Sequence, residues 1–560
     1  MKINPKIAIT LGLVLFTAAC IAFAFDVFHR QFGGYDLSPL IDFQYRLSTG
    51  QIPGRSFILT FPASLGLLLQ VENWIAAPTW FGLLWVNCAL FAFCIACLGA
   101  FWPREFEPWK LVLTSLLLAL PLLYTNHIWH SAMTQWIAIV YCVVCLSALG
   151  KDGRAKIARM LLAAVAGLLF FSKQNLGAPL VVATSFALMG LGFVQPAKRR
   201  VCLHVVVIQV LGVLATAVVI MLCLHMGVAT LVHTFTYVLG RARVSRQQEA
   251  ALPFKAPVIL AAVVFSLGYL LTRAVRRSRT EGVDPLIVAL LAAALIGMAV
   301  YERNYDAILM AAICLFLGVF LVSADLSAEQ DVSAWAIWGT GLLVSVLPLI
   351  TDWDSKYNDA VLPAVSMICL SRPRAAVTRN LLVGGVVVSL LGAATGGWVR
   401  QRMHDVGPGV FWEDARLITI REGYFDGLAV GPHMIEVRKE MLRALREIPH
   451  PDGVFCGPRI EFCYADLGLR SPLGLPLWWH PGTSYPMQAQ GAVVRAFARD
   501  HFSLLMFVKG DRTRMPAALL ALIARDYSSV EGFEALDVYV PRRESGTLAA
   551  SRADQPAPAR

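Results

Sequence analysis

Two aspartates follow the first long apolar run of the chain closely enough to act in one place. Asp36 and Asp42 come soon after the apolar residues 7 to 25. Ser38 and Pro39 between them favour the cap and the first turn of a helix. Because Ser38 is the better cap, Asp36 is left free, and a free carboxylate can accept a proton from a hydroxyl group.

Basic side chains that could bind an anion occur elsewhere in the chain. Lys173 ends an apolar run, where an ammonium group is costly to hold unless it binds an anion or extends to the membrane interface. The segment 226 to 255 lies between two apolar runs and contains Arg241, Arg243, Arg246 and Lys255. Basic residues there suggest an anionic ligand such as a lipid phosphate, and a solvated loop face is the alternative. Arg55 and Arg303 are two further candidates.

Apolar blocks must position these residues. Hydrophobic residues make up 57% of the chain and charged residues 15%, and the apolar ones fall in blocks long enough to cross a bilayer. We predict about thirteen transmembrane helices: 7 to 25, 79 to 100, 110 to 124, 133 to 149, 158 to 171, 177 to 194, 201 to 225, 256 to 272, 285 to 300, 306 to 323, 334 to 351, 358 to 370 and 381 to 398. The sequence therefore predicts a polytopic α-helical membrane protein.

Charge predicts which side each loop faces. The formal net charge is +11, but the excess lies mainly in short loops between spans, so it indicates topology and not binding of nucleic acid. We expect a multi-pass protein of the plasma (inner) membrane with a cytoplasmic N-terminus. An odd number of spans then places the C-terminal residues outside the cytoplasm. The first outer loop, 26 to 78, is the longest.

The composition changes after Trp398, and the membrane domain is therefore predicted over 1 to 398. Residues 399 to 543 alternate helical and strand patterns, which predicts a small extracytoplasmic α/β domain, and 544 to 560 read as a disordered tail. The expected helices are 434 to 447, 489 to 500 and 515 to 526, and the expected strands 453 to 456, 503 to 508 and 535 to 540. Cys456 and Cys463 could form a disulfide if that compartment is oxidising. The aromatic stretches near 455 to 464 and 476 to 482 could bind a sugar or pack on the membrane body, and we favour packing.

The first outer loop adds a family resemblance. After Ser38 we expect a short amphipathic helix on the membrane surface that ends near Gly50 and Pro53. An acid, a surface helix and the stretch Gly50-Gln51-Ile52-Pro53-Gly54-Arg55-Ser56 occur in the order that resembles the GT-C superfamily of membrane glycosyltransferases. Gly54 stands where many relatives have an aromatic residue and Ser56 where they have an acid. The Lys173 turn resembles that family's turn between the fifth and sixth spans.

The resemblance implies a glycosyltransferase similar to protein mannosyltransferases and the lipid A aminoarabinose transferase. Such an enzyme moves a hexosyl or pentosyl group from a polyprenyl-phosphate sugar to a lipid, glycan or protein acceptor of the cell envelope. Asp36, with Asp42 as the second candidate, would be the catalytic carboxylate, and cations would stabilise the leaving phosphate. The phosphate-binding candidates are Lys173, Arg55, Arg243, Arg246 and Arg303. A divalent cation, Mg²⁺ or Mn²⁺, could be held at Asp36 by the substrate phosphate, although the sequence shows no strong metal-ligand spacing.

Other classes fit parts of the pattern. An O-antigen ligase or polymerase that uses a diphosphate-linked glycan would also suit large outer loops with several arginines. A transporter or flippase of envelope precursors would explain the spans, but it predicts charged residues near mid-membrane and an internal repeat, and the sequence shows neither. A non-enzymatic envelope assembly protein is a further alternative.

Overall fold

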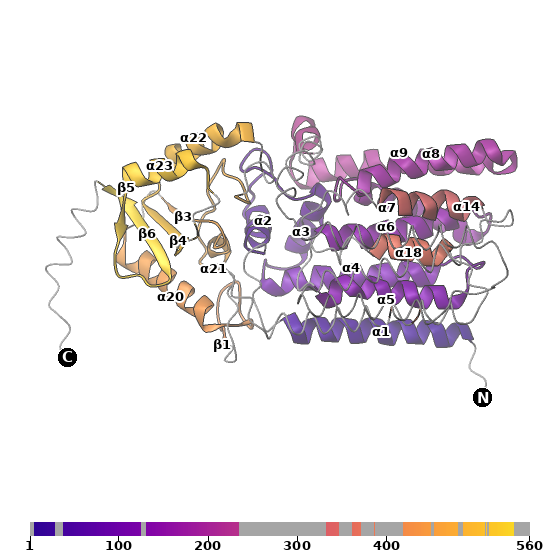
Figure 1. Cartoon of the computed structure of the whole chain (residues 1–560), viewed down its shortest axis with the longest axis horizontal. Coiled ribbons are helices and arrows are strands. Elements are labelled where there is room, and N and C mark those ends of the chain that lie inside the picture. Colours follow the sequence, from indigo (N-terminus) through magenta and orange to yellow (C-terminus); the bar gives the residue numbers. More distant parts are fainter. Residues whose placement is uncertain are drawn as a thin grey trace, which may run out of the picture.

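The structure is a computed structural model that has a helical bundle at one end and an α/β region at the other (Figure 1). It describes residues 5–28, 37–124, 130–234, 332–345, 361–370, 383, 386, 418–449, 453–479, 485, 487–509, 511 and 515–542. The first helix starts at the end of the bundle farthest from the α/β region (Figure 1). We call that end the far end and the opposite one the domain end.

The first seven predicted spans each overlap a helix of the bundle. These helices are α1 (Pro5–Phe28), α4 (Trp80–Phe101), α5 (Pro108–Tyr124), α6 (His130–Ala148), α7 (Gly153–Phe170), α8 (Gly177–Val194) and α9 (Arg199–Cys223). In the part of the chain that the structure describes, five helices are long and apolar enough to cross a membrane. The spans predicted between 256 and 323 lie outside the described residues, so the number thirteen stays a prediction.

Shorter helical pieces complete the described bundle. They are η1 (Pro196–Lys198), α14 (Val332–Ala334), a π-helical turn η2 (Trp335–Gly339), α15 (Thr340–Val344) and α18 (Val361–Leu370). Every residue of α18 is buried. It lies inside the span predicted over 358 to 370.

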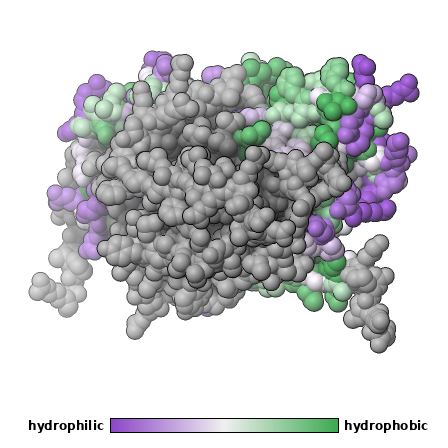
Figure 2. All heavy atoms as spheres, turned by 45° about the vertical axis from the view of Figure 1, so that its right-hand side comes forward, coloured by the Kyte–Doolittle hydropathy of each residue, from purple (hydrophilic) through white to green (hydrophobic). Residues whose placement is uncertain are grey.

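Helices α7 and α9 approach each other closely because glycines face the contact. A Cβ added at Gly212 would lie 2.1 Å from the backbone oxygen of Ala163, and one added at Gly167 would lie 1.9 Å from Oγ1 of Thr216. Small residues of this kind let the backbones of membrane helices touch. The outward face of α9 is apolar, with Leu203, Leu211, Leu214 and Leu222 exposed, and hydrophobic patches appear in the space-filling view beside hydrophilic ones (Figure 2).

Basic residues gather at the far end. The loops there join α4 to α5, α6 to α7 and α8 to α9, and the basic residues in these loops or in the first turns of the helices that follow are Arg104, Lys110, Lys151, Arg154, Lys156, Lys198, Arg199 and Arg200. Two of these loops touch, because Nη2 of Arg154 donates to the carbonyl oxygen of Trp102 at 2.7 Å. Lys110 is buried and donates to the carbonyl oxygen of Cys369 at 3.2 Å. This distribution agrees with the positive-inside pattern on which the orientation was predicted.

A four-stranded sheet organises the α/β region. Its order is β3-β4-β6-β5, with β3 parallel to β4 and the other two pairings antiparallel. The strands are β3 (Val454–Cys456), β4 (Leu504–Val508), β5 (Tyr527–Val530) and β6 (Leu536–Pro541). The helices are α20 (Pro432–Glu447), α21 (Cys463–Asp466), η3 (Met487–Ala489), α22 (Gln490–Asp500) and α23 (Ala517–Asp526), and a small pair, β1 (Ile418–Thr419) and β2 (Ala429–Val430), precedes them.

Helices cover the sheet on both sides (Figure 1). All five residues of β4 are buried. Leu505 and Phe507 share one core with Phe497 of α22, whereas Leu504 and Met506 belong to the larger core that includes α20. This alternation is what a strand buried on both faces requires, because successive side chains point to opposite faces.

Each helix and strand predicted from 434 onward is present within about three residues of its expected bounds. The sequence did not predict β5, which follows α23 without a turn and has the polar centre Ser528 and Ser529. It is held as an edge strand by pairing with β6. The short strands β1 and β2 and the single-turn helix α21 were also missed.

Candidate functional site

Helices α2 (Ser38–Ser48) and α3 (Ala63–Ile75) lie between the bundle and the α/β region (Figure 1). The helix predicted after Ser38 is therefore present, but two expectations about it need correction. Leu37 occupies the cap position without a side-chain hydrogen bond, while the Ser38 hydroxyl binds Glu461 and Phe462 of the α/β region. The helix is also not exposed on a surface, because nine of its eleven residues are buried.

Asp42 forms a buried ion pair within α2. Its carboxylate accepts from Nε of Arg46 at 2.7 Å and from Oγ of Ser471 at 2.7 Å. Nη1 of Arg46 also donates to the carbonyl oxygen of Pro472 at 2.6 Å, and the guanidinium lies over the ring of Phe57. Burial raises the pKa of Asp42, and the Arg46 charge and the Ser471 hydrogen bond oppose that shift. Both carboxylate oxygens have partners, so the geometry favours a structural role for Asp42.

A second buried acid, which sequence reasoning missed, lies on α3. Oε2 of Glu72 accepts from Nε2 of Gln44 at 2.5 Å, and Oε1 of Gln44 accepts from the Tyr424 hydroxyl at 2.5 Å. Gly82 leaves space for this carboxyl, because a Cβ there would lie 2.1 Å from Oε1 of Glu72. Burial raises the pKa of Glu72. The sequence did contain one signal that could have identified this residue: Glu72 is the one acid in the apolar stretch 63 to 75.

Lys173 lies in the turn between α7 and α8, at the domain end. It is 6% exposed, and its Nζ donates to Oγ of Ser131 at 2.5 Å. Its backbone N–H donates to Oγ1 of Thr134 at 3.1 Å. The same turn is tied to the first outer loop, because both the backbone N–H and the hydroxyl of Ser64 donate to the carbonyl oxygen of Phe171. The structure thus brings the turn that carries Lys173 against the start of α3.

Arg55 lies in an exposed turn of the first outer loop. Gly54 before it has a φ of +74°, and a Cβ there would lie 2.0 Å from Cγ2 of Thr230. This turn therefore touches the start of the segment 226 to 255. Four other predicted site residues, Asp36, Arg243, Arg246 and Arg303, lie outside the described residues.

Aromatic residues join the α/β region to the first outer loop. Trp478 stacks on Phe61 with ring centroids 6.2 Å apart, and Phe61 stacks on Phe43 of α2 at 5.7 Å. Gly474 donates its backbone N–H to the carbonyl oxygen of Ser56 at 2.7 Å. The described part of the aromatic stretch, 476 to 479, thus packs against the loop, as we favoured from the sequence.

Two cationic side chains of the predicted site lie at the domain end. Lys173 contributes a buried cation there and Arg55 an exposed one. Within the described ranges no three His, Cys, Asp or Glu side chains are close enough together to hold a metal ion.

Comparison with known proteins gave matches among solved structures alone. No protein-family model matches the sequence, and no curated protein does. Two crystal structures of ArnT from Cupriavidus metallidurans are similar to this chain, one bound to undecaprenyl phosphate and one in the apo state. These neighbours are GT-C glycosyltransferases.

The match to the ArnT structures is long in coverage and low in identity. It covers 95% of this chain and 98% of each ArnT chain, with 15% identity and a TM-score of 0.36 for the bound form and 14% and 0.37 for the apo form. ArnT is the lipid A aminoarabinose transferase, so the neighbours belong to the family that the first outer loop resembles. At these TM-scores the similarity supports no conclusion about the fold or the chemistry. Both rest on the residues described above.

Proposed function

We propose that this protein is an integral membrane glycosyltransferase. It transfers a sugar from a polyprenyl-phosphate-linked donor to a lipid, glycan or protein acceptor of the cell envelope, on the extracytoplasmic face of the plasma membrane. The N-terminus is cytoplasmic and the α/β region extracytoplasmic in this proposal.

The observation that supports it most is the position of Lys173. A buried ammonium at the end of a membrane helix is costly to hold, and such residues commonly mark a substrate or ion pathway. Lys173 is tied through Phe171 and Ser64 to the first outer loop, where the sequence has its candidate base. A phosphate at this position would lie where a membrane lipid presents its headgroup, at the boundary between the bundle and the α/β region.

The proposed roles follow from the chemistry of transfer. A sugar leaves its phosphate more readily when cations stabilise the charge that develops on the phosphate oxygens. Lys173 and Arg55 supply such charge in this proposal, joined by Arg243, Arg246 and Arg303. Asp36 removes the proton from the acceptor hydroxyl or orients that hydroxyl. Asp42 is not retained as a catalytic residue, because both its oxygens are used within the protein.

Two features support the proposed orientation. Basic residues gather at the far end, as expected for cytoplasmic loops. Cys456 and Cys463 form a disulfide in the α/β region, and structural disulfides persist in oxidising compartments. Both features favour a cytoplasmic far end and an extracytoplasmic domain end.

The test measures sugar release from polyprenyl-phosphate sugars by the purified full-length protein in lipid nanodiscs. We expect turnover in the wild type, none in Asp36→Asn, and a fall of about a hundredfold in Lys173→Met. Lys110→Met is the matched control, because Lys110 is also a buried lysine at a helix end but lies at the far end. It should keep turnover per folded molecule.

Unchanged turnover in Asp36→Asn would remove Asp36 as the candidate base. No sugar release by the wild type from any polyprenyl-phosphate sugar would remove the proposal. Movement of labelled substrate across sealed vesicles, without any covalent product, would favour a transporter.

A further inference from the structure

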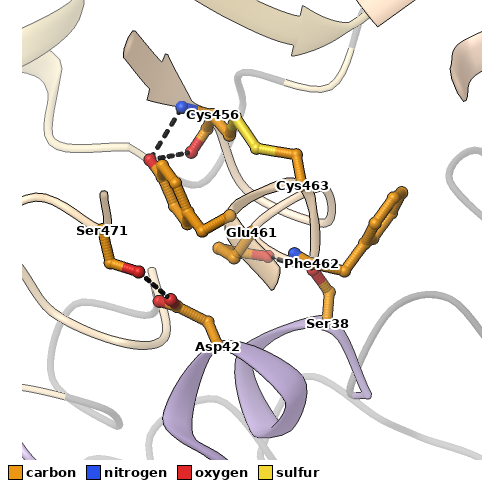
Figure 3. Close-up of a disulfide and its surroundings, with 8 residues drawn as sticks. Ser38, Asp42, Cys456, Glu461, Phe462, Cys463 and Ser471 are labelled. Carbon is orange, nitrogen blue, oxygen red and sulfur yellow. Dashed lines mark hydrogen bonds between the residues drawn. A yellow bond between two sulfur atoms is a disulfide. The ribbon is translucent and has the colours of Figure 1, made fainter. Parts of the chain in front are cut away.

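A disulfide closes a short loop of the α/β region directly above α2 (Figure 3). It joins Cys456, the last residue of β3, to Cys463, the first residue of α21. The Tyr464 hydroxyl accepts from the backbone N–H of Cys456 at 2.8 Å. The loop is therefore fixed to the sheet by a covalent bond and by a hydrogen bond beside it, and its residues have little freedom to move.

Two neighbouring residues of this loop hold one serine of α2. The Ser38 hydroxyl donates to Oε2 of Glu461 at 2.6 Å and accepts from the backbone N–H of Phe462 at 3.0 Å (Figure 3). Ser38 is fully buried and Glu461 is 3% exposed. Because the hydroxyl both donates and accepts, its position and direction are set by the loop.

The charged side chains around Glu461 form ion pairs with one another. Asp42 lies one turn along α2 and pairs with Arg46. Arg459 in the loop pairs with Asp511 at 2.7 Å. The Tyr464 hydroxyl lies near Asp42, Arg46 and Glu461. Burial, with the Asp42 charge adding to it, raises the pKa of Glu461 to about 8 against the hydrogen bonds from Ser38 and the backbone. At neutral pH this side chain is thus a neutral carboxylic acid, for which glutamine is a close substitute.

We propose that Glu461 is a positioning residue, which fixes the first turn of α2 through Ser38 and so aligns the first outer loop for transfer. This inference rests on the proposed function, because the loop that it aligns carries the candidate base two positions before Ser38 in the sequence. The C-terminal region thereby takes part in the reaction without touching the substrate.

The experiment compares four variants of the full-length protein in nanodiscs: Glu461→Ala, Glu461→Gln, Ser38→Ala and the double variant Glu461→Ala/Ser38→Ala. Small errors in alignment can lower a rate strongly, so we expect kcat to fall about tenfold or more in Glu461→Ala, with the KM for the donor little changed. Glu461→Gln should restore kcat. The double variant should be no worse than either single one, because both act through the same contact.

Glu440→Ala is the matched control. Glu440 is also a buried glutamate of the α/β region, and its carboxylate accepts from the backbone N–H groups of Glu534, Ala535 and Leu536, away from α2. Its loss should lower the unfolding temperature and leave kcat per folded molecule unchanged. A fall in kcat for this control equal to that of Glu461→Ala would attribute the effect to general destabilisation and overturn the inference.

Hydrogen exchange of residues 37 to 48 gives a readout that does not depend on turnover. We expect faster exchange in Glu461→Ala and wild-type exchange in Glu461→Gln. Unchanged exchange in Glu461→Ala, or unchanged kcat in a preparation where Asp36→Asn is inactive, would overturn the inference and leave the proposed function standing. No sugar release by the wild type would instead overturn the proposed function.

Discussion

The Asp42 carboxylate and the Arg46 guanidinium lie one helical turn apart in α2 and form an ion pair of 2.7 Å with both side chains almost fully buried. Such a pair is worth little compared with apolar packing, but removal of one partner leaves the other charge without compensation. The same two side chains bind Ser471 and Pro472 of the α/β region. The pair therefore belongs to the joint between the two parts of the molecule.

We predict that Arg46→Met lowers the free energy of unfolding by about 3 kcal/mol, because it leaves the Asp42 carboxylate buried without its cation. The double variant Asp42→Asn/Arg46→Met should recover part of that loss, since no charge is then left alone. Thermal unfolding of the purified protein in detergent measures both. Equal stability of the single and double variants would contradict this account.

The disulfide should stabilise the α/β region. Replacement of both Cys456 and Cys463 by serine opens the loop that carries Glu461, and loss of a short cross-link of this kind costs about 2–3 kcal/mol. We expect a lower unfolding temperature and faster hydrogen exchange in α2. Cys223→Ser serves as the control, because Cys223 is a free cysteine at the end of α9. The result would be contradicted if the serine variant kept the wild-type unfolding temperature.

Stability should depend on pH through Glu461. The pKa of Glu461 is raised from 4.5 to about 8 in the folded protein. Its contribution to the free energy of unfolding is therefore complete below pH 4.5 and is lost as the pH rises to about 8. The slope is at most about 1.4 kcal/mol per pH unit. Glu461→Gln lacks this contribution. The unfolding temperature of Glu461→Gln minus that of the wild type should therefore increase from pH 5 to pH 8 and then level off. A difference that stays constant across this range would show that Glu461 does not retain its proton.

Close contact between α7 and α9 should depend on Gly212. Gly212→Leu places a side chain against the backbone of Ala163 and forces the helices apart, at a cost of about 1–3 kcal/mol. Gly190→Leu on α8 is the control, because nothing lies within 4 Å of a Cβ added there. Unfolding in a graded detergent series compares the two variants. Similar losses at both positions would mean that the contact is not tight.

Local patterns predicted much of the fold. Apolar block length indicated the positions of α4 and α8, and alternation with turn residues indicated β4 and α20. Such local rules failed at Ser38. Ser38 is a good helix cap by its type and position, but its side chain instead binds residues that lie more than 400 positions later. The site was predicted less well for the same reason. Glu72 joins Gln44 and, through it, Tyr424, and no local pattern reveals a contact across that distance in sequence.

The position of α2 has a consequence for how the molecule is made. Chains emerge from the ribosome N-terminus first, and domains generally fold as units in that order. Ser38, Asp42 and Gln44 are synthesised early, yet Glu461, Ser471 and Tyr424 come from the last third of the chain. The segment after the first helix must therefore wait through most of biogenesis for its partners, and the molecule becomes complete only when the α/β region has folded against α2.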